Sequence, residues 1–268
     1  MGAANRSLID LKLASTQKAA KLTGSARTMT KPVLLLLPGL LCDEANWAAQ
    51  CADLAGMADC RVPAYPTLDS IEAMAEHVLA TAPPGGFAMA GHSMGGRVAL
   101  EVLRRAPERI ERLALLDTGF QALAAGEAGE KERAGRHQLL ALAQSEGMRA
   151  MGTQWACGMV HPSRLGTPVF EAILDMIARH TPAMFAAQIQ ALLARPDASA
   201  LLPQIRCPTL LLCGRDDLWS PLVRHESMQR AIPGARLEVI ELSGHMTTME
   251  QPRAVSQALA QWLALRHG

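Results

Sequence analysis

Short apolar runs alternate with helix-like stretches along most of this chain, and that alternation limits the folds open to it. The run at 33–37 is apolar throughout and ends at Pro38-Gly39, which is typical of a strand buried on both faces of a parallel sheet. Further strands are expected at 87–90, 113–117, 208–214 and 236–240, with a weaker candidate at 61–64.

Helical periodicity fills most intervals between these strands. Apolar residues recur at helical spacing over 70–82, where Ser70 is a suitable N-cap and Pro83-Pro84 ends the helix. Other helices are expected at 47–58, 97–105, 222–231 and 252–265. Because strands that alternate with helices form βαβ units, the sequence predicts an α/β fold with a mostly parallel sheet flanked by helices.

The alternation stops between residues 120 and 205. This interval has helical patterns at 138–143, 169–179 and 183–194 but no convincing strand. We therefore predict that 32–119 and 206–268 form the α/β core and that 120–205 is a helical cap over the site.

The first 31 residues differ from the rest in charge. They hold six Lys or Arg against Asp10 alone, a balance of +5 in a chain whose net charge is +1. The segment lacks the apolar stretch of a secretory signal, so we predict a basic extension, disordered or loosely helical. A transit-like peptide, a tail and sequence upstream of a start at Met29 all stay open.

Composition excludes several classes of protein. With 26 basic and 25 acidic residues, the chain lacks the overall positive field of a nucleic-acid-binding protein. No apolar run approaches the roughly 18 residues of a membrane span, so no membrane partner is expected. The six cysteines form no CxxC pair, which argues against zinc and against a disulfide framework and favours a cytoplasmic protein with reduced thiols.

The segment Gly91-His92-Ser93-Met94-Gly95 matches the pattern G-x-S-x-G between an expected strand and an expected helix. A serine on such a sharp turn has strained backbone angles, and side chains two residues away on either side would collide. Gly96 further allows the helix to pack close to the strand. The turn would present the Ser93 hydroxyl at the carboxyl edge of the sheet as a nucleophile, ahead of a helix N-terminus.

A serine nucleophile needs a base, and His245 is the favoured candidate. It follows the strand expected at 236–240, so its loop would project at the same sheet edge. His92 is next to the serine but would point the wrong way. His161 and His180 fall in the predicted cap, where a contact with substrate is the less favoured reading of each.

The base needs a carboxylate to orient it and to stabilise its positive charge. Asp217 follows the strand at 208–214 and is the favoured acid, whereas Asp216 would serve as a cap or pair near Arg215. Asp117 ends another strand at this edge and is the main rival.

The oxyanion of the reaction needs N–H donors. The main-chain N–H of Met94, directly after the nucleophile, is one candidate. The loop after the first strand should supply the second, and Gly39 would allow a tight bend that aims the N–H of Leu40 inward. The N–H of Leu41 is the less favoured alternative.

These motifs together resemble the α/β-hydrolase superfamily, from about residue 31 to the C-terminus, and in particular small bacterial esterases and 3-oxoadipate enol-lactonase-like hydrolases. The matching segments are Pro38-Gly39-Leu40 with Trp47, Gly91–Gly96, Gly214–Asp217 with Pro221, Gly244-His245 and Glu250–Pro252. The resemblance implies Ser93 as nucleophile, Asp217 as acid, His245 as base, and the amides of Leu40 and Met94 as the oxyanion hole.

The chain departs from this family in two places. Many relatives have His-Gly where this chain has Pro38-Gly39, so the oxyanion loop could differ in shape. Residues 1–31 show no leading hairpin, and we therefore expect about six parallel strands in place of the usual eight.

The expected activity is hydrolysis of a carboxylic ester or lactone with a small-to-medium apolar group, without a metal or organic cofactor. Leu41, Trp219 and Met246 are the candidate substrate contacts, in a pocket rich in Met and Leu. Carbon–carbon bond hydrolysis and thioester hydrolysis on the same residues stay open, as does a receptor that binds a small molecule with little turnover. No feature of the sequence indicates an oligomeric state.

Overall fold

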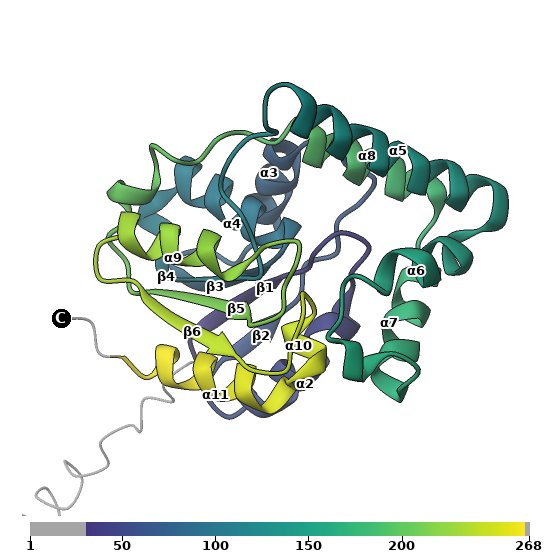
Figure 1. The fold of residues 1–268 in the computed structure, drawn as a ribbon. Coiled ribbons are helices and arrows are strands. Elements are labelled where there is room, and N and C mark those ends of the chain that lie inside the picture. Colours follow the sequence, from purple (N-terminus) through teal and green to yellow (C-terminus); the bar gives the residue numbers. More distant parts are fainter. Residues whose placement is uncertain (1–30, 266–268) are drawn as a thin grey trace, which may run out of the picture. The chain divides into compact units, whose positions relative to one another are not determined.

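A computed structural model describes residues 31–265, so the extension predicted for 1–31 lies outside the described residues except for Lys31. Its centre is a sheet of six strands in the order β2-β1-β3-β4-β5-β6, and every neighbouring pair is parallel (Figure 1). The strands are β1 (Val33–Leu37), β2 (Asp59–Arg61), β3 (Phe87–His92), β4 (Ile110–Leu116), β5 (Thr209–Gly214) and β6 (Arg236–Ile240). The predicted six-stranded parallel sheet is confirmed.

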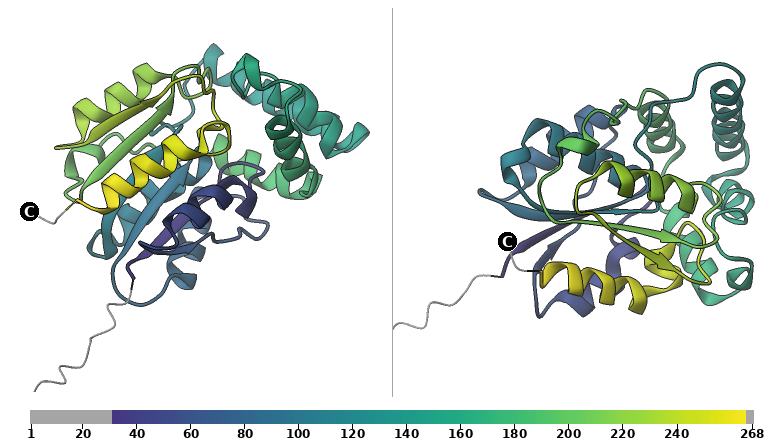
Figure 2. Two further views of the ribbon diagram at one scale, coloured as in Figure 1. Left: turned by 90° about the horizontal axis from the view of Figure 1, so that it is seen from below. Right: turned by 60° about the vertical axis from the view of Figure 1, so that its left-hand side comes forward.

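Both faces of the sheet are buried, as the apolar runs predict. Successive side chains of a strand point to opposite faces. Leu34 and Leu36 therefore join one apolar cluster, whereas Leu35 and Leu37 join the other. The helices α2 (Ala48–Leu54) and α11 (Pro252–Leu263) cover the first face, and α3 (Ile71–Thr81), α4 (Met94–Arg105) and α9 (Leu222–Ala231) cover the second (Figure 2).

Four helices follow one another between β4 and β5, on the side to which the strand arrows point in Figure 1. They are α5 (Glu127–Glu146), α6 (Met148–Ala156), α7 (Pro168–Ala178) and α8 (Pro182–Leu193). We call residues 120–205 the α5–α8 segment. The remaining elements are α10 (Thr247–Glu250) and the 3₁₀ turns η1 (Glu44–Trp47), η2 (Pro107–Arg109), η3 (Pro162–Arg164) and η4 (Leu202–Gln204).

Several boundaries differ from the prediction for physical reasons. The helix expected at 138–143 is the end of the much longer α5, whose first half is too charged to show an apolar period. The strand expected at 61–64 lies earlier, at β2, because Pro63 has no N–H with which to continue the ladder. Helix α4 begins at Met94 despite the poor helix propensity of Gly95-Gly96, since tight packing against the sheet fixes its start.

The strand order reverses at β1. The chain moves from β1 to β2 on one side and then returns to place β3 on the other side of β1. Ligands of open α/β sheets bind outside the carboxyl ends of the strands at such a reversal. The loops after Leu37 and His92 therefore meet where a site is expected.

Among the described residues, no helix combines the length and the apolar character needed to cross a bilayer.

Candidate active site

Ser93 occupies the sharp turn from β3 to α4, with φ 54° and ψ −116°. A non-glycine residue with positive φ is strained and needs its surroundings to hold it. A Cβ at position 91 would lie 2.7 Å from the Cα of Gly96, and one at position 95 would lie 2.7 Å from the carbonyl oxygen of Pro38. Glycine is thus required on both sides of the serine because main chain approaches main chain.

The same turn is held from β4. The hydroxyl of Thr118, just beyond the end of β4, donates a hydrogen bond to the carbonyl oxygen of Ser93 at 2.6 Å. A Cβ at position 96 would lie 2.6 Å from the Thr118 side chain, so Gly96 is what allows α4 to begin this close to the sheet.

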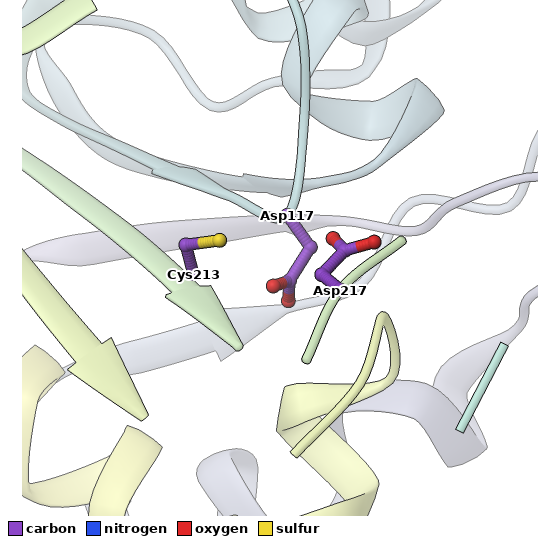
Figure 3. Close-up of side chains that lie close together, drawn as sticks. All are labelled: Asp117, Cys213 and Asp217. Atoms are coloured by element: carbon purple, nitrogen blue, oxygen red, sulfur yellow. The ribbon is translucent and has the colours of Figure 1, made fainter. Parts of the chain in front are cut away.

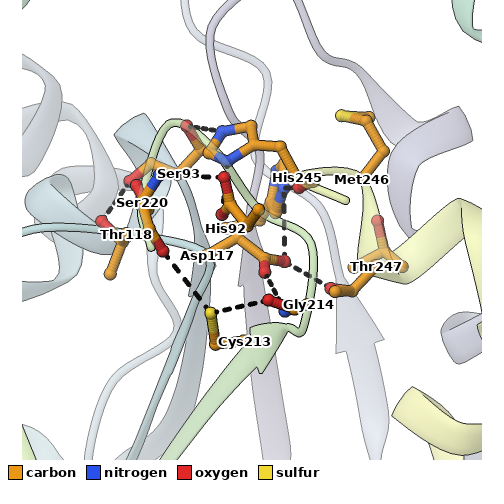
Figure 4. A network of polar contacts seen from close by, with 12 residues as sticks. His92, Ser93, Asp117, Thr118, Cys213, Gly214, Ser220, His245, Met246 and Thr247 are labelled. Atoms are coloured by element: carbon orange, nitrogen blue, oxygen red, sulfur yellow. Dashed lines mark hydrogen bonds and ion pairs between the residues drawn. The ribbon is translucent and has the colours of Figure 1, made fainter. Parts of the chain in front are cut away.

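Three side chains far apart in the sequence form one path of hydrogen bonds. Figure 4 labels two of them, Ser93 and His245. The Nε2 atom of His245 lies 2.8 Å from Ser93 Oγ, and its Nδ1 atom lies 2.8 Å from Asp217 Oδ2. In this geometry the imidazole can take the serine proton while the carboxylate holds the ring. Their catalytic roles stay predictions.

Hydrogen bonds stabilise the ionised form of Asp217 although its side chain is buried. Its Oδ1 atom accepts the N–H groups of Trp219 at 2.8 Å and Ser220 at 2.9 Å. Burial acts to raise its pKa, but the charge and hydrogen bond of His245 together with these N–H groups leave the pKa below the usual value. A carboxylate in this state stabilises a protonated imidazole.

Asp117, the rival acid, lies beside this path without a hydrogen bond to His245. Its Oδ1 atom accepts the N–H of Gly214 at 2.9 Å, and its Oδ2 atom accepts the hydroxyl of Thr247. Burial, and then the charge of Asp217, raise the pKa of Asp117 well above its usual value. Asp117 therefore connects the ends of β4 and β5 to the start of α10 and does not contact the imidazole.

Asp117, Cys213 and Asp217 offer potential ligand atoms within 4.8 Å of one another (Figure 3). Both carboxyl groups are already bound by the partners given above. The thiol of Cys213 contacts the carbonyl oxygens of Gly214 and Ser220, and burial raises its pKa far above the ordinary value. Since a metal needs a thiolate, we assign no metal to this cluster.

The loop that carries His245 is fixed from three directions. His92, which points away from Ser93 Oγ, places Nε2 2.8 Å from the carbonyl oxygen of His245, and burial followed by the charge of His245 lowers its pKa to about 3. The N–H of His245 donates to Met159 in the α5–α8 segment at 2.6 Å. The Glu250 carboxylate accepts the N–H groups of Gly244, Met246 and His161 at 3.0, 3.1 and 2.8 Å.

The loop after β1 makes a tight turn in which the N–H of Cys42 bonds the carbonyl oxygen of Gly39 at 3.2 Å. Leu41 has φ 55°, and its N–H donates to Gln188 Oε1 on α8 at 2.9 Å. That bond removes Leu41 from the candidate oxyanion donors. In the described part of the chain, no acceptor engages the N–H of Leu40 or of Met94.

A cavity of about 440 Å³ adjoins Ser93 and His245. Trp219 and Met246 line it as predicted, but Leu41 does not, because it is fully buried behind the turn. The Trp219 ring lies 5.1 Å from the Trp155 ring and 5.2 Å from the His245 ring, between centroids. The apolar part of the wall thus contains more aromatic surface than the sequence suggests.

The cavity also has a charged wall that sequence reasoning missed. It comprises Arg97 and Arg224 from the core and Lys131, Glu132, Arg136 and Arg195 from the α5–α8 segment. Only Arg97 could have indicated this charged wall from the sequence. It directly follows the Gly95-Gly96 pair, and the first turn of α4 after Ser93 must face the site. Gln188 and Glu250 were missed as supports since their partners are distant in sequence.

The other polar candidates lie elsewhere. His161 places its Nε2 atom 3.8 Å from Asp216, and His180 contacts the carbonyl oxygen of Met176; neither lines the cavity beside Ser93. Arg215 forms its ion pair with Glu241 at 2.6 Å, and Asp216 acts on Arg215 through its charge without a direct ion pair.

The geometry agrees with what the chain resembles. A family model described as the alpha/beta hydrolase family matches residues 34–258. A pimeloyl-[acyl-carrier protein] methyl ester esterase of Nitrosomonas europaea is 30% identical over 189 residues, which cover 69% of this chain and 74% of that protein. A thermophilic esterase from Thermogutta terrifontis has 30% identity and a TM-score of 0.76, with 87% of this chain and 90% of that chain covered.

The enol-lactonase from Burkholderia xenovorans LB400 is similar in fold. It has 22% identity and a TM-score of 0.78, and the match covers 89% of this chain and 94% of that chain.

Proposed function

Since the chain belongs to the alpha/beta hydrolase family, we propose that it hydrolyses a carboxylic ester or lactone through an acyl-enzyme on Ser93. The observation that carries this proposal is the path of 2.8 Å contacts from Asp217 through His245 to Ser93 Oγ, at the wall of a cavity. The esterase relatives support hydrolysis as the reaction class.

The first half of the reaction forms the acyl-enzyme. His245 takes the proton of Ser93 as the oxygen attacks the carbonyl carbon, and Asp217 stabilises the resulting imidazolium. The main-chain N–H groups of Leu40 and Met94 then bind the oxyanion, and a donor of this kind contributes about 3–4 kcal/mol. His245 returns the proton to the leaving alcohol.

The second half releases the acid. Water, activated by His245, attacks the acyl carbon, and the proton finally returns to Ser93. Trp219 and Met246 are the proposed apolar contacts of the substrate, while Leu41 is left out of the binding surface. The reaction uses groups of this chain and water only.

Hydrolysis of p-nitrophenyl butanoate tests the proposal. Ser93→Ala should lower kcat by about 10⁶-fold, whereas Ser145→Ala on the exposed face of α5 should leave it unchanged. A fluorophosphonate should add covalently to the wild type and not to Ser93→Ala, as mass spectrometry can measure.

Two results would contradict ester hydrolysis. Covalent labelling of Ser93 without ester turnover would favour the carbon–carbon or thioester reaction on the same residues. Neither labelling nor turnover, together with tight binding of a small molecule, would favour a receptor.

A further inference from the structure

The cavity beside Ser93 carries an excess of positive charge. Five cationic side chains line it, and Glu132 is the one acidic side chain among the described lining residues. Burial of charges away from water is unfavourable unless opposite charges compensate them. Each of these cations therefore needs an acidic partner, from the protein or from a ligand.

Glu132 forms ion pairs with two of these cations, Arg195 and Arg136. Its carboxylate receives Arg195 at 2.7 and 2.9 Å through both terminal nitrogens, and Arg136 Nε at 3.0 Å. Burial acts to raise the pKa of Glu132, but the hydrogen bonds and charges of Arg195 and Arg136 hold it at about 2. Both oxygens of this carboxylate therefore already accept hydrogen bonds from Arg195 or Arg136.

Of the four arginines that line the cavity, Arg97 and Arg224 are left without a carboxylate. In the part of the chain that the structure describes, neither forms an ion pair, and their polar contacts are to the carbonyl oxygens of Gln121 and Trp219. Burial, followed by the charges of Arg195 and Arg224, lowers the pKa of Arg97 to about 9. Two half-buried guanidinium groups thus repel each other, and the charge of Glu132 offsets this only in part for Arg97.

Both guanidinium groups converge on one point near the nucleophile. A Cβ at Gly119 would lie 2.8 Å from Arg97 Nη2 and 3.1 Å from Arg224 Nη1, so the missing side chain there makes room for both. Gly119 directly follows Thr118, whose hydroxyl holds the Ser93 carbonyl. Arg97 lies four residues after Ser93, one turn into α4.

We propose that Arg97 and Arg224 bind a carboxylate of the substrate, so that the ester or lactone cleaved at Ser93 carries a second, anionic group. This inference rests on the proposed function and adds the substrate class to it. A guanidinium presents a planar fork of donors that matches a carboxylate, and such charge-assisted bonds are about twice as strong as neutral ones. The apolar wall at Trp219 and Met246 then contacts the chain between the two groups.

The test compares two esters that differ in one charge. The first is the mono-p-nitrophenyl ester of adipate, and the second is its neutral counterpart with the free carboxylate converted to a methyl ester. The wild type should have the higher kcat/KM for the anionic ester, by about 10- to 100-fold, the effect expected of charge-assisted hydrogen bonds.

Substitutions test whether Arg97 and Arg224 cause the preference for the anionic ester. Arg97→Gln and Arg224→Gln should each lower the ratio of the two kcat/KM values by about tenfold or more, while Arg230→Gln on the exposed part of α9 keeps it. Because both esters are measured on the same preparation, partial loss of folded enzyme cancels from the ratio.

Binding gives a second measurement that does not depend on turnover. Calorimetry with Ser93→Ala should show tighter binding of the anionic ester, and adding Arg97→Gln should remove the difference. Equal kcat/KM values for the two esters, or a preference that survives both arginine substitutions, would overturn the inference and leave ester hydrolysis standing. Loss of turnover for both esters, with binding still selective for the anion, would instead count against the proposed function alone.

Discussion

Asp117 and Asp217 bring carboxylate oxygens within 4.8 Å of each other, yet only Asp217 bonds the imidazole of His245. Both side chains are buried, and two like charges this close are unfavourable in such surroundings. The burial of Asp117 and the charge of Asp217 raise the pKa of Asp117, whereas His245 helps to lower that of Asp217. The surroundings thus shift the pKa values of the two aspartates in opposite directions, and only Asp217 contacts His245.

The two aspartates should respond differently to the same substitution. Asp217→Asn should lower kcat by about 10⁴-fold, because an amide cannot hold the histidine tautomer or stabilise its charge. Asp117→Asn should lower kcat by less than about tenfold, since an asparagine can still bond Gly214 and Thr247. Steady-state kinetics on both variants make the comparison, and a larger loss for Asp117→Asn would reverse the assignment of the acid.

Gly95 should tolerate no side chain. In Gly95→Ala the new Cβ would meet the carbonyl oxygen of Pro38 at 2.7 Å, so main chain would have to move. We expect the free energy of unfolding to fall by about 1–3 kcal/mol or more. Gly56→Ala is the matched control, because no heavy atom lies within 4 Å of its Cβ. Urea unfolding compares the two, and equal effects would contradict the close approach at the turn.

Gln188 should act on the oxyanion loop through Leu41. In Gln188→Leu the buried N–H of Leu41 would lose its acceptor, at a cost of about 1–3 kcal/mol. A resulting shift of the Leu40 N–H should lower kcat by up to about 100-fold with a smaller change in KM. Gln190→Leu, exposed on the same helix, should change neither. An unchanged kcat in Gln188→Leu would show that the loop holds its shape without α8.

His225 should make the protein less stable in acid. It is buried, its Nε2 accepts the N–H of Thr118, and burial lowers its pKa to about 4. The folded state therefore takes up this proton less readily than the unfolded chain, so stability falls as pH drops below about 6.5. Between pH 7 and pH 5 this residue should remove about 2 kcal/mol of stability.

Comparison with His225→Gln isolates that contribution from those of His92 and Asp117. The variant should lose less stability than the wild type between pH 7 and pH 5, as measured by urea unfolding at each pH. Parallel losses in the two proteins would mean that the pKa of His225 is the same in the folded and unfolded states.

The parts of the structure that could be predicted are those set by local pattern. The apolar run of β1 ends at Pro38-Gly39, and the glycines around Ser93 allow main chain to approach main chain, so the buried strand and the sharp turn follow from local pattern. Asp217 and His245 follow strand ends, and parallel strands bring those ends to one edge.

The parts that could not be predicted depend on partners distant in sequence. The acceptor of the Leu41 N–H is Gln188, 147 residues away, and nothing near either residue indicates the other. The first half of α5 is highly charged, so its pattern indicates an exposed helix and hides the fact that Lys131, Glu132 and Arg136 face the cavity. A pocket expected to be apolar therefore has a cationic wall.

The link between His245 and Met159 has a consequence for exchanging parts among relatives. The N–H of His245 and the carboxylate of Glu250 both bind main chain of residues 159–161, so the α5–α8 segment helps to position the His245 loop as well as to line the cavity. A chimaera that transplants this segment from another enzyme would inherit its selectivity only if the graft reproduces that short backbone stretch.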